Sequence, residues 1–407
     1  MPRPSHSHLS SLVPRDPDFD IAWNEIEAVL SREFEDMRAT PQDPRYHAEG
    51  DVLTHTMMVV ESLVSDATWR GLPEDRREIM FWATILHDVG KPATTQHEED
   101  GSITSRGHSR VGADIARRFL MEAGSPFWWR EEVCGLIEHH QAPFWLMKRG
   151  NPEKKAISIS YACNTADLCL HARHDIHGRI CEDPENVLEN IDIAEMQFAD
   201  AECLGAPRTF RNDMSRIEYL ARPDRYVDYV AHEDYRNYVI LMCGLPGAGK
   251  DTWIAGNAPT WNQVCLDDLR QEMGIAPDDN QGPVVQAAKE RAREHLRRRE
   301  QFVWNATNVT RQKRSELLSL FRGYGAHTTI VYLEPDLETI RSQNRGRPDQ
   351  VPDKAFGRML SKLEPPRVDE AHSVAWVVDG GLHFRGALGV TPCLDEKSEL
   401  MERLAGP

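Results

Sequence analysis

The sequence predicts two domains of different class, an all-α domain followed by an α/β domain with a parallel sheet. Up to about residue 205, apolar residues recur at three- and four-residue spacing, which is typical of helices. After Pro207, apolar runs of strand length alternate with helical stretches, which indicates parallel strands joined by crossover helices. The 407 residues suffice for two or three domains at about 150 residues each.

The composition narrows the class of protein. With 40% hydrophobic and 28% charged residues, the chain can bury two cores. A formal net charge of −17 gives no overall attraction to nucleic acid, so any such contact must be local, at a strand end. This disfavours a sequence reader and leaves an end-processing enzyme open. The eight cysteines form no CxxC pair, and no signal peptide or membrane-length apolar run is seen, so we expect a cytoplasmic protein without a membrane partner.

The helical domain is expected to span residues 18–206. Residues 1–17 are rich in Pro, Ser and His and are expected to be disordered. Turns that contain glycine and proline, such as Gly71-Leu-Pro73, separate the helices. The expected helices are Ile21–Phe34, Val52–Val64, Arg76–His87, Val111–Ala123, Glu131–His139, Ile157–His171 and Val187–Leu204.

Histidine and aspartate recur on or near the ends of these helices. Imidazole nitrogen and carboxylate oxygen together favour a divalent ion such as Mn²⁺, Fe²⁺, Co²⁺, Ni²⁺ or Zn²⁺. Such an ion turns bound water into a nucleophile near neutral pH. A single residue such as His55 is more often an ordinary core or surface residue, but the whole ordered set favours a metal centre. The candidate ligands are His55, His87, Asp88, His108, His139, His140 and Asp167.

This ordered set resembles the HD-domain phosphohydrolase superfamily over about residues 45–205. The core metal ligands that the resemblance implies are His55, His87, Asp88 and Asp167. A second metal site, which Asp88 could bridge, would be completed by His108 and by either His139 or His140. Lys91 matches the family's lysine that contacts the substrate phosphate. The resemblance implies phosphohydrolysis, of a nucleotide, a cyclic phosphodiester or a phosphomonoester.

The α/β domain is expected to span residues 238–407, after a polar linker at 207–237. Its sheet is expected to be parallel because helical stretches separate the strands. The expected strands are 238–243, 263–266, 301–305, 327–333 and 374–378, and the clearest helices are 284–300 and 311–322.

The first of these strands leads into a glycine-rich loop that ends in lysine. Backbone N–H groups of such a loop wrap a phosphate chain, while the helix dipole and the lysine supply positive charge. The loop predicts ATP or another NTP with Mg²⁺ as cofactor. The usual motif follows the lysine with Ser or Thr to hold Mg²⁺, but this chain has Asp251 there. The candidate nucleotide-binding residues are Gly244, Gly247, Ala248, Gly249, Lys250, Asp251 and Thr252.

Paired acids follow the second strand of this domain. Asp267 at the mouth of a ligand crevice could accept the proton of an attacking hydroxyl, as phosphoryl transfer to an alcohol requires. Asp268 and Arg270 could bind the acceptor, with Arg270 holding one of its phosphates. The plainer interpretation is that an aspartate here caps a helix.

Two further segments bear on the same site. The third strand ends in Asn305-Ala306, where a Walker-B acid would be expected. Arg345 and Arg347 lie in a segment rich in Gly, Pro and Arg that could close as an arginine lid over the donor phosphates. That segment could instead be a solvated basic turn.

From the glycine-rich loop to about residue 375, the order and spacing of these motifs resemble phage-type polynucleotide 5′-kinases. The resemblance implies that Lys250 and Thr252 engage the donor phosphates and that Asp267 is the general base. It assigns Arg270 to the acceptor-strand phosphate and Arg347 to the lid. Two positions depart from the pattern, Asp251 and the missing acid near residues 305–306.

Together the two halves resemble bacterial bifunctional end-healing enzymes. The resemblance implies a kinase that phosphorylates 5′-OH ends and an HD domain that hydrolyses 2′,3′-cyclic phosphate or terminal 2′- or 3′-phosphate. RNA or DNA strand ends would be the substrates, and a polynucleotide ligase is a candidate partner. One alternative is a small-molecule kinase fused to an HD nucleotidase that acts on free nucleotides. Another is a nucleotide-gated regulatory protein with degenerate sites.

Overall fold

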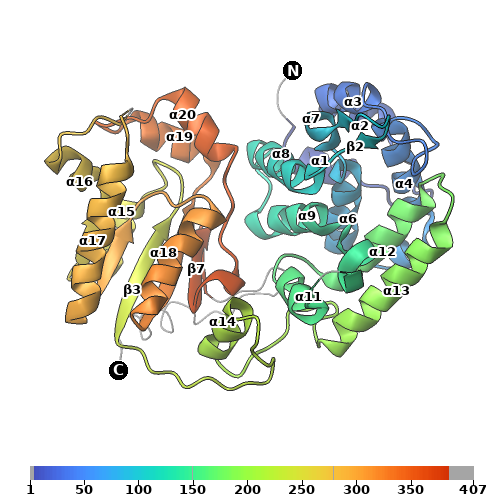
Figure 1. Ribbon diagram of the computed structural model, residues 1–407. Coiled ribbons are helices and arrows are strands. Elements are labelled where there is room, and N and C mark those ends of the chain that lie inside the picture. The colour runs from blue at the N-terminus through green and yellow to red at the C-terminus, as the bar shows by residue number, and fades with distance from the viewer. Residues whose placement is uncertain (1–3, 149, 278, 385–407) are drawn as a thin grey trace. The chain divides into compact units, whose positions relative to one another are not determined.

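The computed structural model of the protein describes residues 4–148, 150–277 and 279–384 (Figure 1). The chain divides into two compact units, Met1–Arg208 and Thr209–Pro407. These are called the first unit and the second unit. No helix in the described ranges combines the length and apolar composition needed to cross a bilayer.

The described part of the first unit consists of helices and loops, one isolated bridge between Pro41 and Asp51, and one short antiparallel hairpin in which Gln96 pairs with Thr104 and His97 with Ile103. The sequence does not reveal this hairpin because each strand has only two residues. The elements are α1 (His6–Ser11), α2 (Trp23–Val29), α3 (Ser31–Arg38), α4 (Val52–Ser65), α5 (Ala67–Arg70), α6 (Glu74–Leu86), α7 (Lys91–Thr94), β1 (Gln96–His97), β2 (Ile103–Thr104), α8 (His108–Glu122), α9 (Phe127–His139), α10 (Ala142–Trp145), the 3-10 turn Leu146–Lys148, α11 (Pro152–Ser160), α12 (Thr165–His177) and α13 (Pro184–Asp200).

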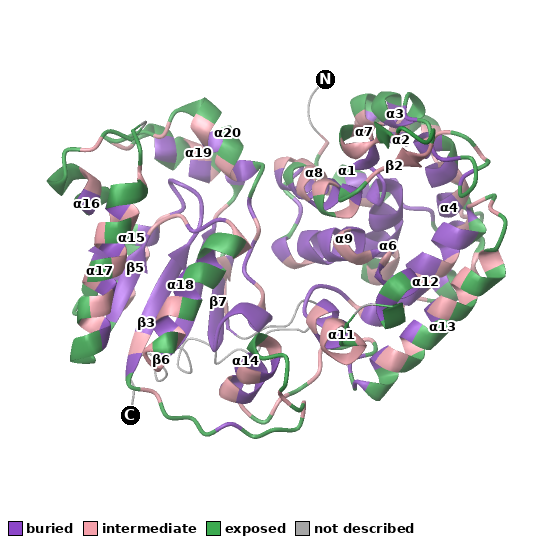
Figure 2. Ribbon diagram, viewed as in Figure 1, coloured by how far each residue is buried: buried purple, intermediate pink, exposed green. Residues whose placement is uncertain are grey.

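Helices α6 and α9 form the centre of the first unit (Figure 2). Every residue of α6 from Glu78 to Leu86 is buried, as expected for a helix surrounded by other helices. Helix α6 packs against α4 and α9, and α9 packs against α8. The sequence places His87-Asp88 directly after α6 and His140 directly after α9, so the two central helices end at the same polar cluster.

The N-terminal segment differs from the expected disorder. Residues 4–17 are ordered, and α1 begins after Ser5, whose side chain accepts a hydrogen bond from the backbone of His8. Leu9 is fully buried, and Trp82 Nε1 donates to the Leu9 carbonyl at 3.1 Å. A contact with a residue 73 positions away therefore orders a segment whose own composition is typical of disorder.

Two expected helices are each divided in the structure. The stretch Ile21–Phe34 breaks at Leu30, between α2 and α3. The stretch Ile157–His171 breaks between α11 and α12, where Asn164 caps α12 by accepting from the backbone of Ala166 and Asp167. Apolar periodicity continues across both breaks and does not reveal them; a side-chain cap marks only the second break, at Asn164.

The second unit contains a six-stranded sheet in the order β4-β5-β3-β6-β7-β8, parallel except for β8. All five predicted strands are present, and β8 is an addition at the edge. The elements are α14 (Asp213–Ala221), β3 (Asn237–Cys243), α15 (Lys250–Asn257), β4 (Asn262–Cys265), α16 (Leu266–Glu272), α17 (Gly282–Arg298), β5 (Phe302–Asn305), α18 (Arg311–Gly323), β6 (Ala326–Glu334), α19 (Leu337–Arg345), α20 (Asp353–Leu360), the 3-10 turn Val368–Glu370, β7 (Ser373–Val378) and β8 (Gly381–Phe384).

The central strand β3 explains where the glycine-rich loop lies. Residues Val239–Cys243 are buried, with β5 and β6 as parallel neighbours on either side. The loop therefore starts at the carboxyl end of a central strand, where open α/β sheets bind ligands. The ends of β4 and β5 lie at the same edge, because Cys265 pairs with Asn305.

The expected linker at 207–237 is in large part folded into the second unit. Ile217 and Tyr219 of α14 are buried, and Arg216 donates to the carbonyls of Ala371 and His372 at 2.8 and 2.9 Å. The polar composition of this segment does not indicate such packing, because Arg216 Nη2 donates to backbone carbonyls that are distant in sequence. The end of the predicted α/β domain, residues 385–407, lies outside the described residues.

Candidate active sites

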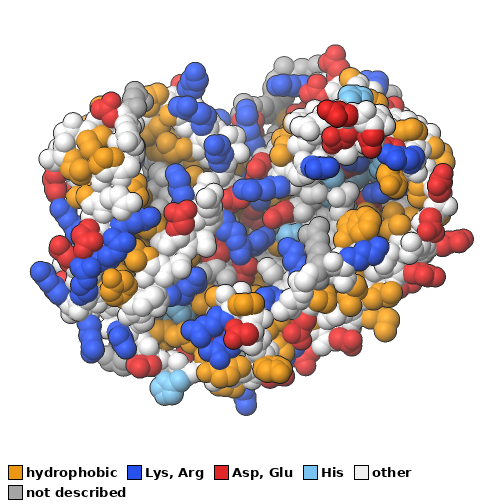
Figure 3. Space-filling view, viewed as in Figure 1, with side chains coloured by type: hydrophobic (Ala, Val, Ile, Leu, Met, Phe, Trp, Pro, Cys, Tyr) orange, Lys and Arg blue, Asp and Glu red, His pale blue; other side chains and the backbone are white. Residues whose placement is uncertain are grey.

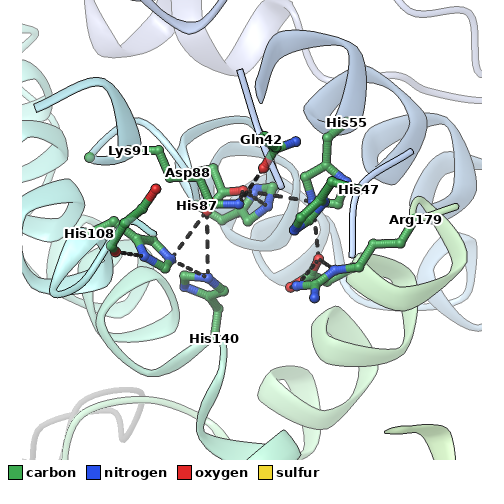
Figure 4. Close-up of polar contacts among 12 residues, drawn as sticks. Gln42, His47, His55, His87, Asp88, Lys91, His108, His140 and Arg179 are labelled. Atoms are coloured by element: carbon green, nitrogen blue, oxygen red, sulfur yellow. Dashed lines mark hydrogen bonds and ion pairs between the residues drawn. The ribbon is translucent and has the colours of Figure 1, made fainter. Parts of the chain in front are cut away.

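A buried cluster of histidines surrounds Asp88 in the first unit (Figure 4). Each ligand comes from a helix end: His55 from the first turn of α4, Asp88 from just after α6, and His108 from the start of α8. His87 and His140 directly follow α6 and α9. All five side chains are at most 5% exposed.

Asp88 presents one carboxylate oxygen to each pair of histidines. Oδ2 lies 3.2 Å from His87 Nε2 and 3.7 Å from His55 Nε2. Oδ1 lies 3.3 Å from His108 Nε2 and 3.8 Å from His140 Nε2. This arrangement suits two ions bridged by a single carboxylate, with one pair of histidines on each ion.

Backbone carbonyls fix the orientation of the rings. Nδ1 of His87, His108 and His140 lies 2.7, 2.7 and 2.8 Å from the carbonyl three residues earlier. Because a carbonyl only accepts, each Nδ1 carries the proton and each Nε2 turns its lone pair towards Asp88. This is the outer-shell arrangement that metal-ligating histidines use. His87 Nε2 is buried and has no hydrogen-bond partner within the described ranges, which fits a metal ligand.

The electrostatics of the cluster agree with this assignment. Burial alone would raise the pKa of the Asp88 carboxyl, but the charges of His87 and Lys91 hold that pKa well below its usual value. Burial, with His108 nearby, lowers the pKa of His140 well below its usual value. An ionised carboxylate beside imidazoles with lowered pKa values, those of His108 and His140, suits a divalent transition ion.

The predicted ligand Asp167 lies apart from the histidine cluster in this structure, and Asp175 lies beside His55 instead. Asp167 contacts Arg76, which also lies 3.3 Å from Glu132. Two turns further along α12, Asp175 Oδ1 lies 3.1 Å from His55 Nε2. Arg179 Nη2 donates to both Asp175 oxygens at 2.9 Å and, with His55, holds the pKa of the buried Asp175 carboxyl well below its usual value.

The structure also separates the two adjacent candidates after α9. His140 faces Asp88, whereas His139 Nε2 lies 3.9 Å from Glu138. Sequence reasoning missed His171, which is buried with its ring centroid 5.4 Å from that of His87. Burial lowers the pKa of His171 to about 3, so the ring stays neutral beside the cluster. Its position three residues before His174-Asp175 on α12 was the available signal.

A second missed pair lies on the outer side of His55. Glu49 Oε1 is 3.0 Å from His55 Nδ1 and 2.7 Å from His47 Nδ1. The Glu49 carboxylate and the Gly178 carbonyl, 3.1 Å from the same nitrogen, orient the His55 ring. A carboxylate in this position raises the basicity of a metal-ligating imidazole.

A cavity of about 420 Å³ opens beside the cluster. Lys91 lies at its edge, with Nζ 2.7 Å from Asp88 Oδ2 and donating to Gln42 Oε1 at 2.6 Å. The wall combines basic and aromatic side chains with one histidine of the cluster. The wall includes Tyr46, Lys91, Arg106, His108, Trp145 and Arg179.

The glycine-rich loop of the second unit has the predicted form. Gly244, Gly247 and Gly249 all have positive φ. At Gly247 a Cβ would lie 2.5 Å from the Ile340 carbonyl of α19, so only glycine fits. Lys250 Nζ donates to the Gly244 and Leu245 carbonyls at 3.1 and 3.0 Å, and burial lowers its pKa to about 8.

The predicted base and two arginines lie together in the second unit. Arg270 Nη1 donates to Asp267 Oδ1 at 2.6 Å, and Arg347 Nη2 lies 3.8 Å from Asp267 Oδ2. A helix-capping role for Asp267 is not what the structure shows, because Cys265 precedes α16 without a side-chain cap. Asp268 and Arg345 are exposed, on α16 and at the end of α19.

The two departures from the usual motif contact each other. Asn305 Nδ2 donates to Asp251 Oδ1 at 2.7 Å. Asn305 is the last residue of β5, and Asp251 is the second residue of α15. Thr252 follows it on the exposed side of α15.

Comparison with protein families supports the same division. Residues 52–167 match the HD domain family and residues 239–366 match an AAA domain family. The chain therefore carries a helical HD domain followed by a P-loop kinase-like α/β domain with a mostly parallel sheet, and the predicted fold class is confirmed. HD domains bind divalent metals and P-loop kinases use an NTP with Mg²⁺, so both cofactor classes have a domain to hold them.

Relatives with assigned names match only part of the chain. The multifunctional CCA protein of Hahella chejuensis is 29% identical over 100 residues, which cover 25% of this chain and 21% of that protein. The CC-adding tRNA nucleotidyltransferase of Thermus thermophilus is 36% identical over 104 residues, again 25% and 21%. The match thus spans about a fifth of these relatives. Among solved structures, a gluconokinase from Sinorhizobium meliloti is 22% identical with a TM-score of 0.28, covering 42% of this chain and 94% of that one.

Proposed function

We propose that the protein is a bifunctional nucleic-acid end-healing enzyme. The kinase-like domain transfers the γ-phosphate of ATP or another NTP to a 5′-OH polynucleotide end. The HD domain hydrolyses 2′,3′-cyclic phosphate or a terminal 2′- or 3′-phosphate. The observation that carries the proposal is the contact between Asp267 and Arg270, because it joins a base for the 5′-hydroxyl to a guanidinium for the adjacent strand phosphate.

In the kinase-like domain, the chain's own residues position the donor and the acceptor. The loop amides and Lys250 hold the phosphate chain at the N-terminus of α15. Asp267 accepts the proton of the 5′-hydroxyl. Arg347, whose Nη2 lies 3.8 Å from Asp267 Oδ2, neutralises charge that develops on the transferred phosphoryl group. Bound Mg²⁺ would supply further charge neutralisation between the donor phosphates.

In the HD domain, one ion would be held by His55, His87, Asp88 and Asp175, and a second by His108, His140 and the shared Asp88. Such ions, when bound, supply an activated water. Lys91 holds the substrate phosphate next to Asp88. Arg179 and Arg106 on the cavity wall offer guanidinium groups for the remaining phosphate oxygens.

The cavity of the HD domain suits the terminal nucleotide of a strand. Tyr46 and Trp145 are 60% and 45% exposed at its wall, although large aromatic side chains are usually more buried. Aromatic faces stack unpaired bases, which is how proteins hold single-stranded ends. On the face drawn in Figure 3, basic and acidic side chains are interspersed, which supports recognition of an end over binding along a track. The relative named as a CC-adding tRNA nucleotidyltransferase also supports a nucleic-acid substrate.

A free nucleotide would fit the same cavity, so an HD nucleotidase fused to a small-molecule kinase is the second candidate. Its support is the cavity volume, which is that of a small-molecule site. Hydrolysis rates on RNA that ends in 2′,3′-cyclic phosphate, compared with free cyclic and free mononucleotides, separate the two. End healing predicts a higher kcat/KM for the RNA. A higher kcat/KM for free nucleotides would support the second candidate.

The two activities are tested with single substitutions. Asp267→Ala should abolish phosphorylation of a 5′-OH oligonucleotide by labelled ATP and leave phosphohydrolysis unchanged, and His87→Ala should do the reverse. Matched controls are Glu272→Ala, an exposed acid on the same helix as Asp267, and His177→Ala, an exposed histidine on α12. Both controls should keep both activities. Loss of both activities in either test variant would contradict two independent sites.

A further inference from the structure

In the nucleotide site of the kinase-like domain, the acidic residue follows the glycine-rich loop, whereas in most P-loop enzymes it lies at the end of a strand. In P-loop enzymes a Ser or Thr after the loop lysine and a Walker-B aspartate on a strand share the Mg²⁺. In this chain the residue after Lys250 is Asp251, and the end of the strand next to β3 carries Asn305. The position that usually holds a neutral hydroxyl residue thus holds an acid, and the position that usually holds an acid holds a neutral amide.

The two residues are in contact although 54 positions separate them. Asn305 is 7% exposed and donates through Nδ2 to Asp251 Oδ1 at 2.7 Å. Asp251 itself is exposed, next to Lys250 at the start of α15. The hydrogen bond uses Oδ1 of the carboxylate, so Oδ2 is the oxygen that can turn towards a cation. A buried amide that orients an exposed carboxylate is the relation of an outer-shell residue to a metal ligand.

We propose that Asp251 and Asn305 have exchanged roles, so that the loop aspartate supplies the carboxylate to Mg²⁺ and the strand asparagine positions it. The exchange keeps one negative charge at the metal and keeps oxygen ligands, which Mg²⁺ prefers. The inference rests on the proposed kinase function only in requiring an NTP with Mg²⁺. Restoring an acid at residue 305 alone would place two carboxylates in contact, and their repulsion would oppose an anionic nucleotide.

The exchange is tested by measuring nucleotide binding rather than turnover. A non-hydrolysable ATP analogue is titrated into the full-length protein with and without Mg²⁺, and the ratio of the two Kd values gives the gain from the metal. Asp251→Ser should reduce that gain by about 100-fold, and Asn305→Ala, which removes only the positioning group, by about tenfold. The double variant Asp251→Ser/Asn305→Asp should recover the gain, because it places a hydroxyl after the loop lysine and a carboxylate at the end of β5, as in the usual motif.

Controls separate this role from a structural one. An acid in the first turn of a helix also favours the helix dipole. If that were the only role of Asp251, Asp251→Ser would weaken binding equally with and without Mg²⁺, and the exchange would be contradicted. Failure of the double variant to exceed both single variants would contradict it as well. Glu272→Gln, which removes an exposed acid from α16, should keep the wild-type gain.

The binding assay also separates this inference from the proposed function. If the predicted ratios hold while no 5′-OH oligonucleotide is phosphorylated, the exchange stands and the polynucleotide acceptor is wrong. If oligonucleotides are phosphorylated while Asp251→Ser keeps the full gain from Mg²⁺, the function stands and the exchange is wrong.

Discussion

The two candidate active sites differ in how their charged groups are held. In the HD domain, Asp88 and its four histidines are buried, and a backbone carbonyl contacts Nδ1 of each ring. In the kinase-like domain, Asp251 and Asp267 are exposed and are oriented by side chains, Asn305 from β5 for Asp251 and Arg270 of the same helix for Asp267. Electrostatic interactions are stronger away from water. The HD site is therefore preorganised by the fold, whereas the kinase site depends on pairwise contacts between side chains.

The largest expected effect comes from removing the charge shared by both pairs of histidines. Asp88→Asn should lower phosphohydrolase activity by about 1,000-fold or more, because it removes a ligand from two ions at once, beyond the 10- to 100-fold typical of outer-shell changes. Bound metal, measured on the purified protein, should fall in parallel while kinase activity is unchanged. A variant that retains both metal and hydrolysis would remove the contrast between the two sites.

Two substitutions on α12 test which of its aspartates binds metal in the HD domain. Asp175→Asn should reduce metal affinity by about 10- to 100-fold, since it removes a carboxylate 3.1 Å from His55 Nε2. Asp167→Asn removes a carboxylate that contacts Arg76 instead and should leave metal affinity close to that of the wild type. Metal titration of both variants gives the two affinities and shows which aspartate is the ligand. The reverse order would restore Asp167 as the ligand.

A smaller, pH-dependent effect tests the kinase site. Burial places the pKa of Lys250 at about 8, below its ordinary value of 10.5. The protonated form binds phosphate, so affinity for ATP should be full below that pKa and fall as pH rises through it, by about tenfold between pH 7 and 9. Equilibrium binding at fixed Mg²⁺ measures this. Lys250→Arg should bind more weakly but without this dependence, because a guanidinium does not titrate there. A wild-type affinity that is constant to pH 9 would contradict the assignment.

Local patterns predicted most of the fold and of the kinase site. The apolar runs identified five of the six described strands of the sheet, and the glycine-rich loop followed from residues adjacent in sequence. Asp267 and Arg270 are three positions apart on one helix, so spacing alone could bring them together.

What the sequence could not show depends on packing between distant segments. Whether Asp167 or Asp175 reaches His55 depends on how α12 packs against α4, which helix periodicity does not determine. Ordering of the N-terminus depends on Trp82, and the contact between Asp251 and Asn305 joins separate elements. In the sequence, Asn305 was visible only as a missing acid.

Both proposed activities can be measured on one substrate, an RNA oligonucleotide with a 5′-OH end and a 2′,3′-cyclic phosphate end, incubated with wild-type protein, ATP, Mg²⁺ and Mn²⁺. Mass analysis of the product reads both ends at once. A bifunctional end-healing enzyme should leave a 5′-phosphate, with the cyclic phosphate opened or removed. An oligonucleotide unchanged at both ends, under conditions in which the protein hydrolyses free nucleotides, would contradict it.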